Sequence, residues 1–250
     1  MASDTTTSKP LHPSASDGNP SATGSNGSDD GQDEVKVITN PNAEVDGLTI
    51  RQWSEVELIK LINTPATAPN GFNDPQGTVA AAINSPHSKM FFITGVPPSD
   101  TAPRTFVIHH GQDVFLPVAV DTDAEGQGIT STLGAGFGGP GQPSFADEVR
   151  QVLAQVKFSN LMVTVDGKAV GNLHETNTGI FSAGVAEKGT AAVPFFGADP
   201  GSSLANTGQV GFFAVFRDLG EGTHTITSTS TTTFQGQSLT QTHTDIIKVV

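Results

Sequence analysis

The sequence has 250 residues, with 12 Lys+Arg against 25 Asp+Glu and a formal net charge of -13 at pH 7. This acidic balance argues against nucleic acid as a partner, and the absence of cysteine excludes disulfides and thiolate metal sites. No segment approaches the roughly 18 consecutive apolar residues that a membrane-spanning helix needs.

Residues 1–44 are predicted to form a disordered acidic arm rich in Ser, Asp and Gly. Leu11 is the only large aliphatic residue from Ala2 to Glu34, so apolar burial cannot offset the entropic cost of ordering this stretch. The first 20 residues lack the basic and apolar regions of a secretory signal peptide. The end of the arm is a candidate strand donor to another copy of the chain, through Val35, Val37 and Ile38.

Residues 45–250 are predicted to form a single domain with three short helices. A capping-box spacing from Thr49 to Gln52 precedes an apolar stripe, which predicts a helix near residues 50–63. Asp74-Pro75 suits a helix start and predicts a helix near 75–84. Ser144 precedes apolar residues at helical spacing, which predicts a helix near 144–157. The stripe expected on the first helix consists of Trp53, Val56, Ile59, Leu61 and Ile62.

Strands dominate the rest of the domain. Runs of β-branched and aromatic residues bounded by Gly, Pro or Asp predict strands at 89–96, 104–109, 113–120, 161–166, 179–185, 191–196, 209–217, 222–233 and 239–250. Turn signals such as Asp166-Gly167 indicate hairpins between neighbouring strands. The predicted fold class is all-β with a few short helices, arranged as an antiparallel, jelly-roll-like β-sandwich.

The order of these segments resembles that of an uncharacterised family of secreted bacterial β-sandwich proteins. The shared features are a tryptophan-bearing helix, an Asp-Pro turn, a strand ending in Gly, a basic residue opening a strand, a Gly-led strand, a Val-Asp-Gly hairpin and a late Gly-Thr-His strand. They are Arg51-Gln52-Trp53, Phe72 to Gly77, Met90 to Gly95, Arg104, Gly111 to Val118, Val165-Asp166-Gly167 and Gly222 to Ile226. The resemblance covers most of residues 53–250 and implies a sandwich fold and export, with an extracellular or cell-surface location. Relatives of this type often contain cysteine, which this sequence lacks.

An acidic segment provides a candidate calcium site. Asp121, Asp123 and Glu125 place oxygen ligands at alternate positions before Gly126, as in the first half of a calcium-binding loop. The twelfth position is Thr132, so the bidentate carboxylate is missing. A solvated acidic turn is the alternative interpretation. No cofactor other than calcium is expected.

A second candidate site would bind a transition metal. His109, His110 and Asp113 form the densest cluster of suitable ligands in the sequence. Adjacent strand residues face opposite sides, so a site would need a further histidine from across the sheet: His174, His224 or His243. The alternative is that one of the two adjacent histidines lies in solvent and the other is hydrogen-bonded.

A threonine array provides a candidate binding surface. Period-two alternation places Thr225, Thr227, Thr229, Thr231 and Thr233 on one face of a strand, and Thr240, Thr242 and Thr244 continue the pattern on the next. A flat array of hydroxyl and methyl groups suits a polysaccharide or ice. A solvent-facing strand of good strand formers is the alternative.

The sequence contains no nucleophile-elbow, Walker-loop or His-Glu-x-x-His motif. We therefore predict a non-catalytic extracellular or cell-surface protein that acts in binding or in self-assembly, as in a matrix, filament or surface layer. One alternative is a carbohydrate-binding or carbohydrate-hydrolysing module using carboxylates such as Asp147 and Glu148, although tyrosine is absent and tryptophan single. The other is a calcium-dependent type I secreted protein, suggested by Asp245-Ile246-Ile247.

Overall fold

The computed structural model describes residues 35–95, 100–125 and 140–250, all within one unit of the chain. Most of the predicted arm, residues 1–34, lies outside these ranges. The strand-rich character expected from the sequence is confirmed. The elements, in chain order, are β1 (Lys36–Ile38), β2 (Glu44–Val45), β3 (Leu48–Thr49), α1 (Ile50–Ile62), α2 (Thr78–Ile83), β4 (Met90–Phe92), β5 (Arg104–Ile108), β6 (Asp113–Ala124), α3 (Phe145–Leu153), β7 (Lys157–Val165), β8 (Lys168–Ala169), β9 (Glu175–Phe181), α4 (Ala192–Phe196), β10 (Thr207–Arg217), β11 (Gly222–Phe234) and β12 (Gln237–Val249).

Two five-stranded sheets contain most of the strands. The first has the order β1-β10-β6-β4, with β9 also pairing with β10, and the second has the order β5-β12-β11-β7-β8. Most pairs are antiparallel, but β4 pairs with β6 in parallel and β5 pairs with β12 in parallel. The expectation of purely antiparallel sheets is therefore wrong at these two pairs. The chain leaves the first sheet for β5 between β4 and β6, so no hairpin joins those two neighbours.

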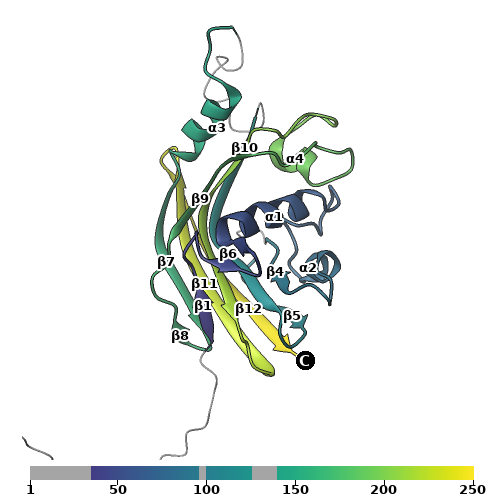
Figure 1. The fold of residues 1–250 in the computed structure, drawn as a ribbon, viewed down its shortest axis with the longest axis vertical. Coiled ribbons are helices and arrows are strands. Elements are labelled where there is room, and N and C mark those ends of the chain that lie inside the picture. The colour runs from purple at the N-terminus through teal and green to yellow at the C-terminus, as the bar shows by residue number, and fades with distance from the viewer. Residues whose placement is uncertain (1–34, 96–99, 126–139) are drawn as a thin grey trace, which may run out of the picture. The chain divides into compact units, whose positions relative to one another are not determined.

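Each face of the first sheet packs against a different partner. Side chains of both five-stranded sheets meet in one hydrophobic cluster, which includes Phe106, Leu116, Val163, Phe216 and Ile247. The opposite face of the first sheet contacts helix α1, where Phe115 and Phe213 join a cluster with Ile50. Figure 1 shows α1 beside the strands of this sheet and α3 near one end of the long strands. None of the described helices is long and apolar enough to cross a membrane.

Helix α1 begins with the predicted capping box. The backbone N–H of Gln52 donates to Thr49 Oγ1 (3.2 Å), and the N–H of Thr49 donates to Gln52 Oε1 (2.9 Å). The buried side of the helix differs from the predicted stripe, because Val56 and Ile59 are only partly buried. The buried residues are Ile50, Ser54, Glu57, Leu58, Leu61 and Ile62. A carboxyl group therefore lies on the buried side of α1.

Several predicted elements have different bounds or a different type in the structure; the strand predicted at 179–185, for example, is β9 at Glu175–Phe181. Helix α2 is shorter than predicted and starts after Gly77. Helix α3 ends at Leu153, because β7 starts at Lys157. The strand predicted at 191–196 is helix α4 instead. Pro194 falls in the first turn of α4, where a missing N–H costs no helical hydrogen bond, and Gly197 ends the helix in the left-handed region at φ 65°.

The predicted strand donor is already paired within its own chain. Strand β1 pairs antiparallel with β10, with Val37 opposite Phe216. Val35 and Val37 pack against the cluster between the sheets, and Ile38 packs against the cluster beneath α1. In this structure the segment is therefore a strand of its own chain's sheet and is not free to be donated to another copy.

Replacing Gly211 with alanine is expected to destabilise the protein by about 1 to 3 kcal/mol, the usual range for overpacking. A Cβ at this position would lie 2.3 Å from the carbonyl oxygen of Ala119, so β10 would have to move away from β6. Urea unfolding of both proteins measures the change. A matched control is Gly171→Ala, whose added Cβ would meet no atom within 4 Å. Equal effects of the two substitutions would contradict the prediction.

Candidate binding cavity

A cavity of about 300 Å³ lies along the edge of β6. Strand β4 pairs only with residues 113–115 of β6. Within the described chain, β6 therefore has a sheet partner on its β10 side alone from Leu116 onward. The cavity borders this edge, and its lining includes residues of α1 on one side and of β12 on the other. Apolar side chains such as Leu58, Leu61, Leu116 and Val118 contribute to the wall.

Glu57 is the most strongly perturbed acid in the cavity lining. Its side chain comes from the buried side of α1 and is 2% exposed. Burial raises the pKa of Glu57 to about 8, and a hydrogen bond with the Gln209 side chain opposes that rise. Glu57 is therefore mainly protonated, and uncharged, at neutral pH.

Gln209 is the cavity residue next to Glu57. It belongs to β10, is 2% exposed, and lies on the same face of the sheet as Phe213 and Val215, which contact the α1 cluster. Glu57 Oε2 and Gln209 Oε1 are both buried, and neither has a hydrogen-bond partner. Buried polar atoms are ordinarily hydrogen-bonded, so these two oxygens are unusual, and both lie behind the surface of the cavity because neither is accessible to solvent.

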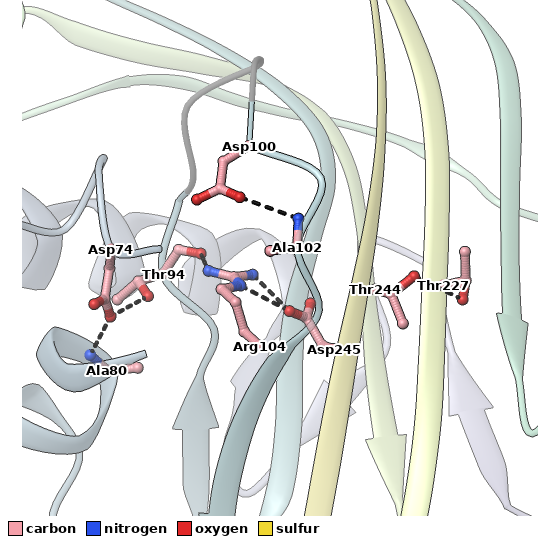
Figure 2. A network of polar contacts seen from close by, with 9 residues as sticks. All are labelled: Asp74, Ala80, Thr94, Asp100, Ala102, Arg104, Thr227, Thr244 and Asp245. Atoms are coloured by element: carbon pink, nitrogen blue, oxygen red, sulfur yellow. Dashed lines mark hydrogen bonds and ion pairs between the residues drawn. The ribbon is translucent and has the colours of Figure 1, made fainter. Parts of the chain in front are cut away.

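The side of the cavity near β5 and β12 contains a buried ion pair (Figure 2). Arg104 Nε and Nη2 each lie 2.8 Å from Asp245 Oδ1, and Arg104 Nη1 donates to the Thr94 carbonyl oxygen at 2.7 Å. Arg104 is 4% exposed and Asp245 is 1% exposed. Burial raises the pKa of Asp245, and the Arg104 guanidinium opposes that rise. The pair neutralises its own charge inside the protein.

The ion pair continues into a network that reaches helix α2. The Thr94 hydroxyl donates to Asp74 Oδ2 (2.8 Å), which also accepts from the backbone N–H of Ala80 (2.9 Å). Figure 2 shows this line of contacts from Ala80 through Thr94 to Arg104 and Asp245. The cavity wall at Thr94 and Arg104 is therefore held by fully buried polar contacts.

Two further titratable groups line the cavity. Burial lowers the pKa of His243, and the nearby Arg104 charge lowers it further, while the backbone and charge of Asp100 oppose these effects. Burial raises the pKa of Asp121, opposed by the hydrogen bond from the Thr122 N–H. Both environments favour the uncharged form of the side chain, as at Glu57.

An aromatic pair forms one part of the wall that reaches the surface. The rings of Phe72 and Phe195 stack with centroids 3.7 Å apart and planes at 5°. Both line the cavity, and Phe195 is 41% exposed. One boundary of the cavity is thus an apolar surface in contact with solvent.

The described part of the predicted calcium loop is mostly strand in the structure. Asp121 and Asp123 lie within β6, where they pair with Val210 and Gly208 of β10. The carboxylate of Glu125 accepts from Ala205 N (3.1 Å) and Asn206 Nδ2 (2.5 Å). The described residues include no group of three or more His, Asp or Glu that could hold a metal ion. Residues 126 and 132 of the proposed loop lie outside the described ranges.

The predicted transition-metal ligands are not brought together. His109 and His110 are both exposed, so the expectation that one is buried or hydrogen-bonded through its side chain finds no support. The Asp113 carboxylate is instead bound by Arg217 Nε at 2.8 Å. Of the distant histidines, His174 contacts Thr39 and His224 contacts Asp166, while His243 lines the cavity.

The threonine array has the predicted alternation, with an added feature. Hydroxyl groups pair across β11 and β12, at 3.4 Å for Thr227 with Thr244, 3.0 Å for Thr229 with Thr242, 2.8 Å for Thr231 with Thr240 and 2.7 Å for Thr233 with Ser238. Thr225 instead faces Ile246. Thr231 is 7% exposed and also accepts from Asn160 Nδ2. The row of threonine hydroxyl groups is therefore not exposed along its whole length. Its binding to a polysaccharide stays a prediction.

Sequence reasoning missed the principal cavity residues. The signal for Glu57 was present, because Ile50, Ser54, Glu57 and Leu61 follow one another at helical spacing. A glutamate on such a stripe indicates a buried carboxyl group. The pairing of Arg104 with Asp245 had no comparable signal, since it depends on which strands become neighbours.

The chain matches no protein-family model, no curated protein and no solved structure among those compared with it. The resemblance to secreted β-sandwich proteins therefore stays a prediction.

Proposed function

We propose that this protein is a non-catalytic binding protein that holds a small, uncharged and largely apolar molecule in the cavity beside β6. The observation that supports this function is the cavity of about 300 Å³, whose wall combines apolar side chains such as Leu58 and Val118 with a few buried polar ones such as Glu57.

The size and lining of the cavity define the ligand class. A volume of about 300 Å³ is at the lower end of the range of about 300–1,000 Å³ that is typical of ligand pockets. The charge of Arg104 is neutralised by Asp245, and burial favours the neutral forms of Glu57 and His243. An anionic ligand would lose its hydration without gaining an unpaired cation among these groups, so an uncharged molecule fits better than an anion.

The wider setting of this function is also a proposal. We propose that the two sheets form a β-sandwich, supported by the hydrophobic cluster that they share, and that the protein acts outside the cell or at its surface, supported by the acidic, cysteine-free composition. Self-assembly by strand addition has less support, because β1 is already paired with β10.

Replacing Ser228 with leucine is expected to abolish ligand binding, because this buried residue lines the cavity and the larger side chain would fill part of it. The measurement is ligand-observed NMR with a library of small uncharged fragments. The matched control is Thr229→Leu, at the next position of β11 and on the opposite face of the sheet. Fragments that bind the wild type and the control but not Ser228→Leu support the function. Failure of every fragment to bind the wild type would overturn it.

A further inference from the structure

The cavity lies where a longer β4 would pair with β6. The N–H of Ile93 still donates to the carbonyl oxygen of Phe115 in β6, at 3.1 Å. Beyond Ile93 the chain turns away, and the N–H of Gly95 donates instead to the carbonyl oxygen of Gly71 (2.8 Å). Thr94 and Gly95 both line the cavity. The cavity therefore occupies the place that the next residues of β4 would have filled.

The backbone edge of β6 forms one wall of this cavity. Every residue from Leu116 to Thr122 belongs to the lining. Successive side chains of a strand point to opposite faces of the sheet. A wall that includes every residue of such a run is therefore formed by the edge of the strand and not by one of its two faces.

The hydrogen bonds of the β6–β10 ladder show which backbone groups face the cavity. Directly after β6, the N–H of Glu125 donates to the carbonyl oxygen of Asn206 across the ladder. Opposed residues of antiparallel strands alternate between bonded and non-bonded pairs, so the N–H and C=O groups of Val120 and Thr122 point away from β10. Gln209, which lies opposite Thr122, agrees with this assignment because its N–H donates to a threonine hydroxyl of β9.

Val120 presents an unpaired donor and an unpaired acceptor along this edge. Among the described residues, none is hydrogen-bonded to its N–H or its C=O. The N–H of Thr122 is already bound by Asp121 Oδ1 at 2.8 Å, which leaves the Thr122 C=O. Val120 and Thr122 are both partly exposed, whereas Val118 and Ala119 between the sheets' inner groups are buried. The open groups of β6 are thus accessible from the cavity.

The two walls beside this edge differ in polarity. Leu58 and Leu61 of α1 line one side, and Gln241 and His243 of β12 line the other. The side chain of Val120 lies on the α1 side, where it packs against the cluster beneath that helix. A strand added to β6 would therefore direct alternate side chains to an apolar wall and to a polar wall.

We propose that the cavity binds a short, uncharged segment of extended peptide, which adds a strand to β6 by bonding to the open backbone groups of Val120 and Thr122. This inference rests on the proposed function of the cavity. A peptide carries N–H and C=O groups in the alternation that an open strand edge pairs with. The paired part is about three residues long, because the open groups extend from Val120 to Thr122. Apolar first and third side chains face α1, and a polar central side chain faces β12.

The first test uses valyl-threonyl-valine, acetylated at its N-terminus and closed by a methylamide, against the full-length wild-type protein. Two isomers each carry two additional N-methyl groups. One has them on the two valine nitrogens and the other on the threonine and terminal amide nitrogens. Alternate N–H groups of a strand point to opposite edges, so just one isomer loses its bonds to β6. That isomer is expected to bind at least about tenfold more weakly than the parent peptide, and the other is expected to bind nearly as well as the parent. Ligand-observed NMR titration measures the three affinities.

The second test replaces Val120 with proline, which removes the N–H that faces the cavity and takes no bond from the β10 ladder. The parent peptide is expected to bind at least about tenfold more weakly to this variant. The matched control is Val107→Pro, in edge strand β5 and outside the cavity lining. The N–H of Val107 also faces away from its neighbouring strand, since the next residue, Ile108, accepts from the N–H of Val250. The control should bind the peptide as the wild type does.

The outcomes distinguish the inference from the function on which it rests. Equal affinities of the three peptides, or equal losses for the two isomers, would overturn strand addition. Fragments that bind the wild type while the parent peptide does not would also overturn it and leave the binding function standing. Failure of the peptide and of every fragment would overturn the function itself. Urea unfolding reports whether each proline variant is folded, and the three peptides decide on the wild type alone if Val120→Pro is not.

Discussion

Replacing Asp245 with alanine is expected to lower the free energy of unfolding by about 3 to 5 kcal/mol, the usual cost of removing one partner from a buried ion pair. Arg104 would keep its positive charge while 4% exposed, and the Thr94 carbonyl oxygen would be its one remaining hydrogen-bond acceptor among the described contacts. Guanidinium-chloride unfolding, followed by circular dichroism, measures the change.

The double variant Arg104→Met with Asp245→Leu provides the control for this prediction. It removes both charges together, so no unpaired charge remains, and it should recover most of the stability that Asp245→Ala loses. Lys89→Met removes the exposed pair with Asp46 and should change stability far less. If Asp245→Ala unfolds at the same denaturant concentration as the wild type, the ion pair does not stabilise the fold as described.

The stability of the wild type is expected to fall as the pH rises from about 4.5 to about 8, by about 4 to 5 kcal/mol from Glu57 alone. In the unfolded chain this carboxyl group releases its proton near its ordinary pKa of 4.5, whereas burial raises the folded-state pKa to about 8. The folded protein therefore binds more protons between these pH values. The stabilisation is fully present below pH 4.5 and is lost as the pH rises through the folded-state value.

Glu57→Gln tests this pH dependence, because glutamine cannot ionise. Urea unfolding at intervals from pH 5 to pH 8 should give a flatter profile for the variant than for the wild type. The residual slope should include Asp123, whose pKa burial raises to about 7, with the nearby Glu148 and Asp121 charges adding to the rise. Glu44→Gln, at an exposed glutamate of β2, is the control. Identical profiles for the wild type and Glu57→Gln would contradict the prediction.

The local features of the fold could be predicted from the sequence because they depend on short-range patterns. The capping box at Thr49 determines where α1 begins, and alternating β-branched residues determine most of the long strands. The segment at 191–196 shows the limit of that approach. Its Ala, Val and Phe residues suit a strand, but Pro194 and Gly197 fit the two ends of a short helix equally well, and the tertiary structure selects the helix.

The pairing of strands that are far apart in the sequence could not be predicted from the same patterns. Strand β5 aligns with β12 in parallel, which places Arg104 opposite Asp245, and no turn signal indicates a pairing of that kind. Acidic residues at alternate positions, as at Asp121 and Asp123, occur both in calcium-binding loops and in strands. In the structure these two residues belong to a strand, because they pair with β10. The candidate site was missed for this reason, since its residues come from α1, β6, β10 and β12 and meet only in the folded chain.

The pairing of β5 with β12 also affects the order in which the protein can fold during synthesis. Arg104 and Asp245 are 141 residues apart in the sequence. Most of the domain is therefore synthesised before Asp245, the counter-ion of Arg104, has been added to the chain. Contacts of such long range slow folding. The cavity wall at Gln241, His243 and Asp245 forms only when β12 inserts between β5 and β11. Nascent chains that end before β12 therefore lack this wall of the cavity.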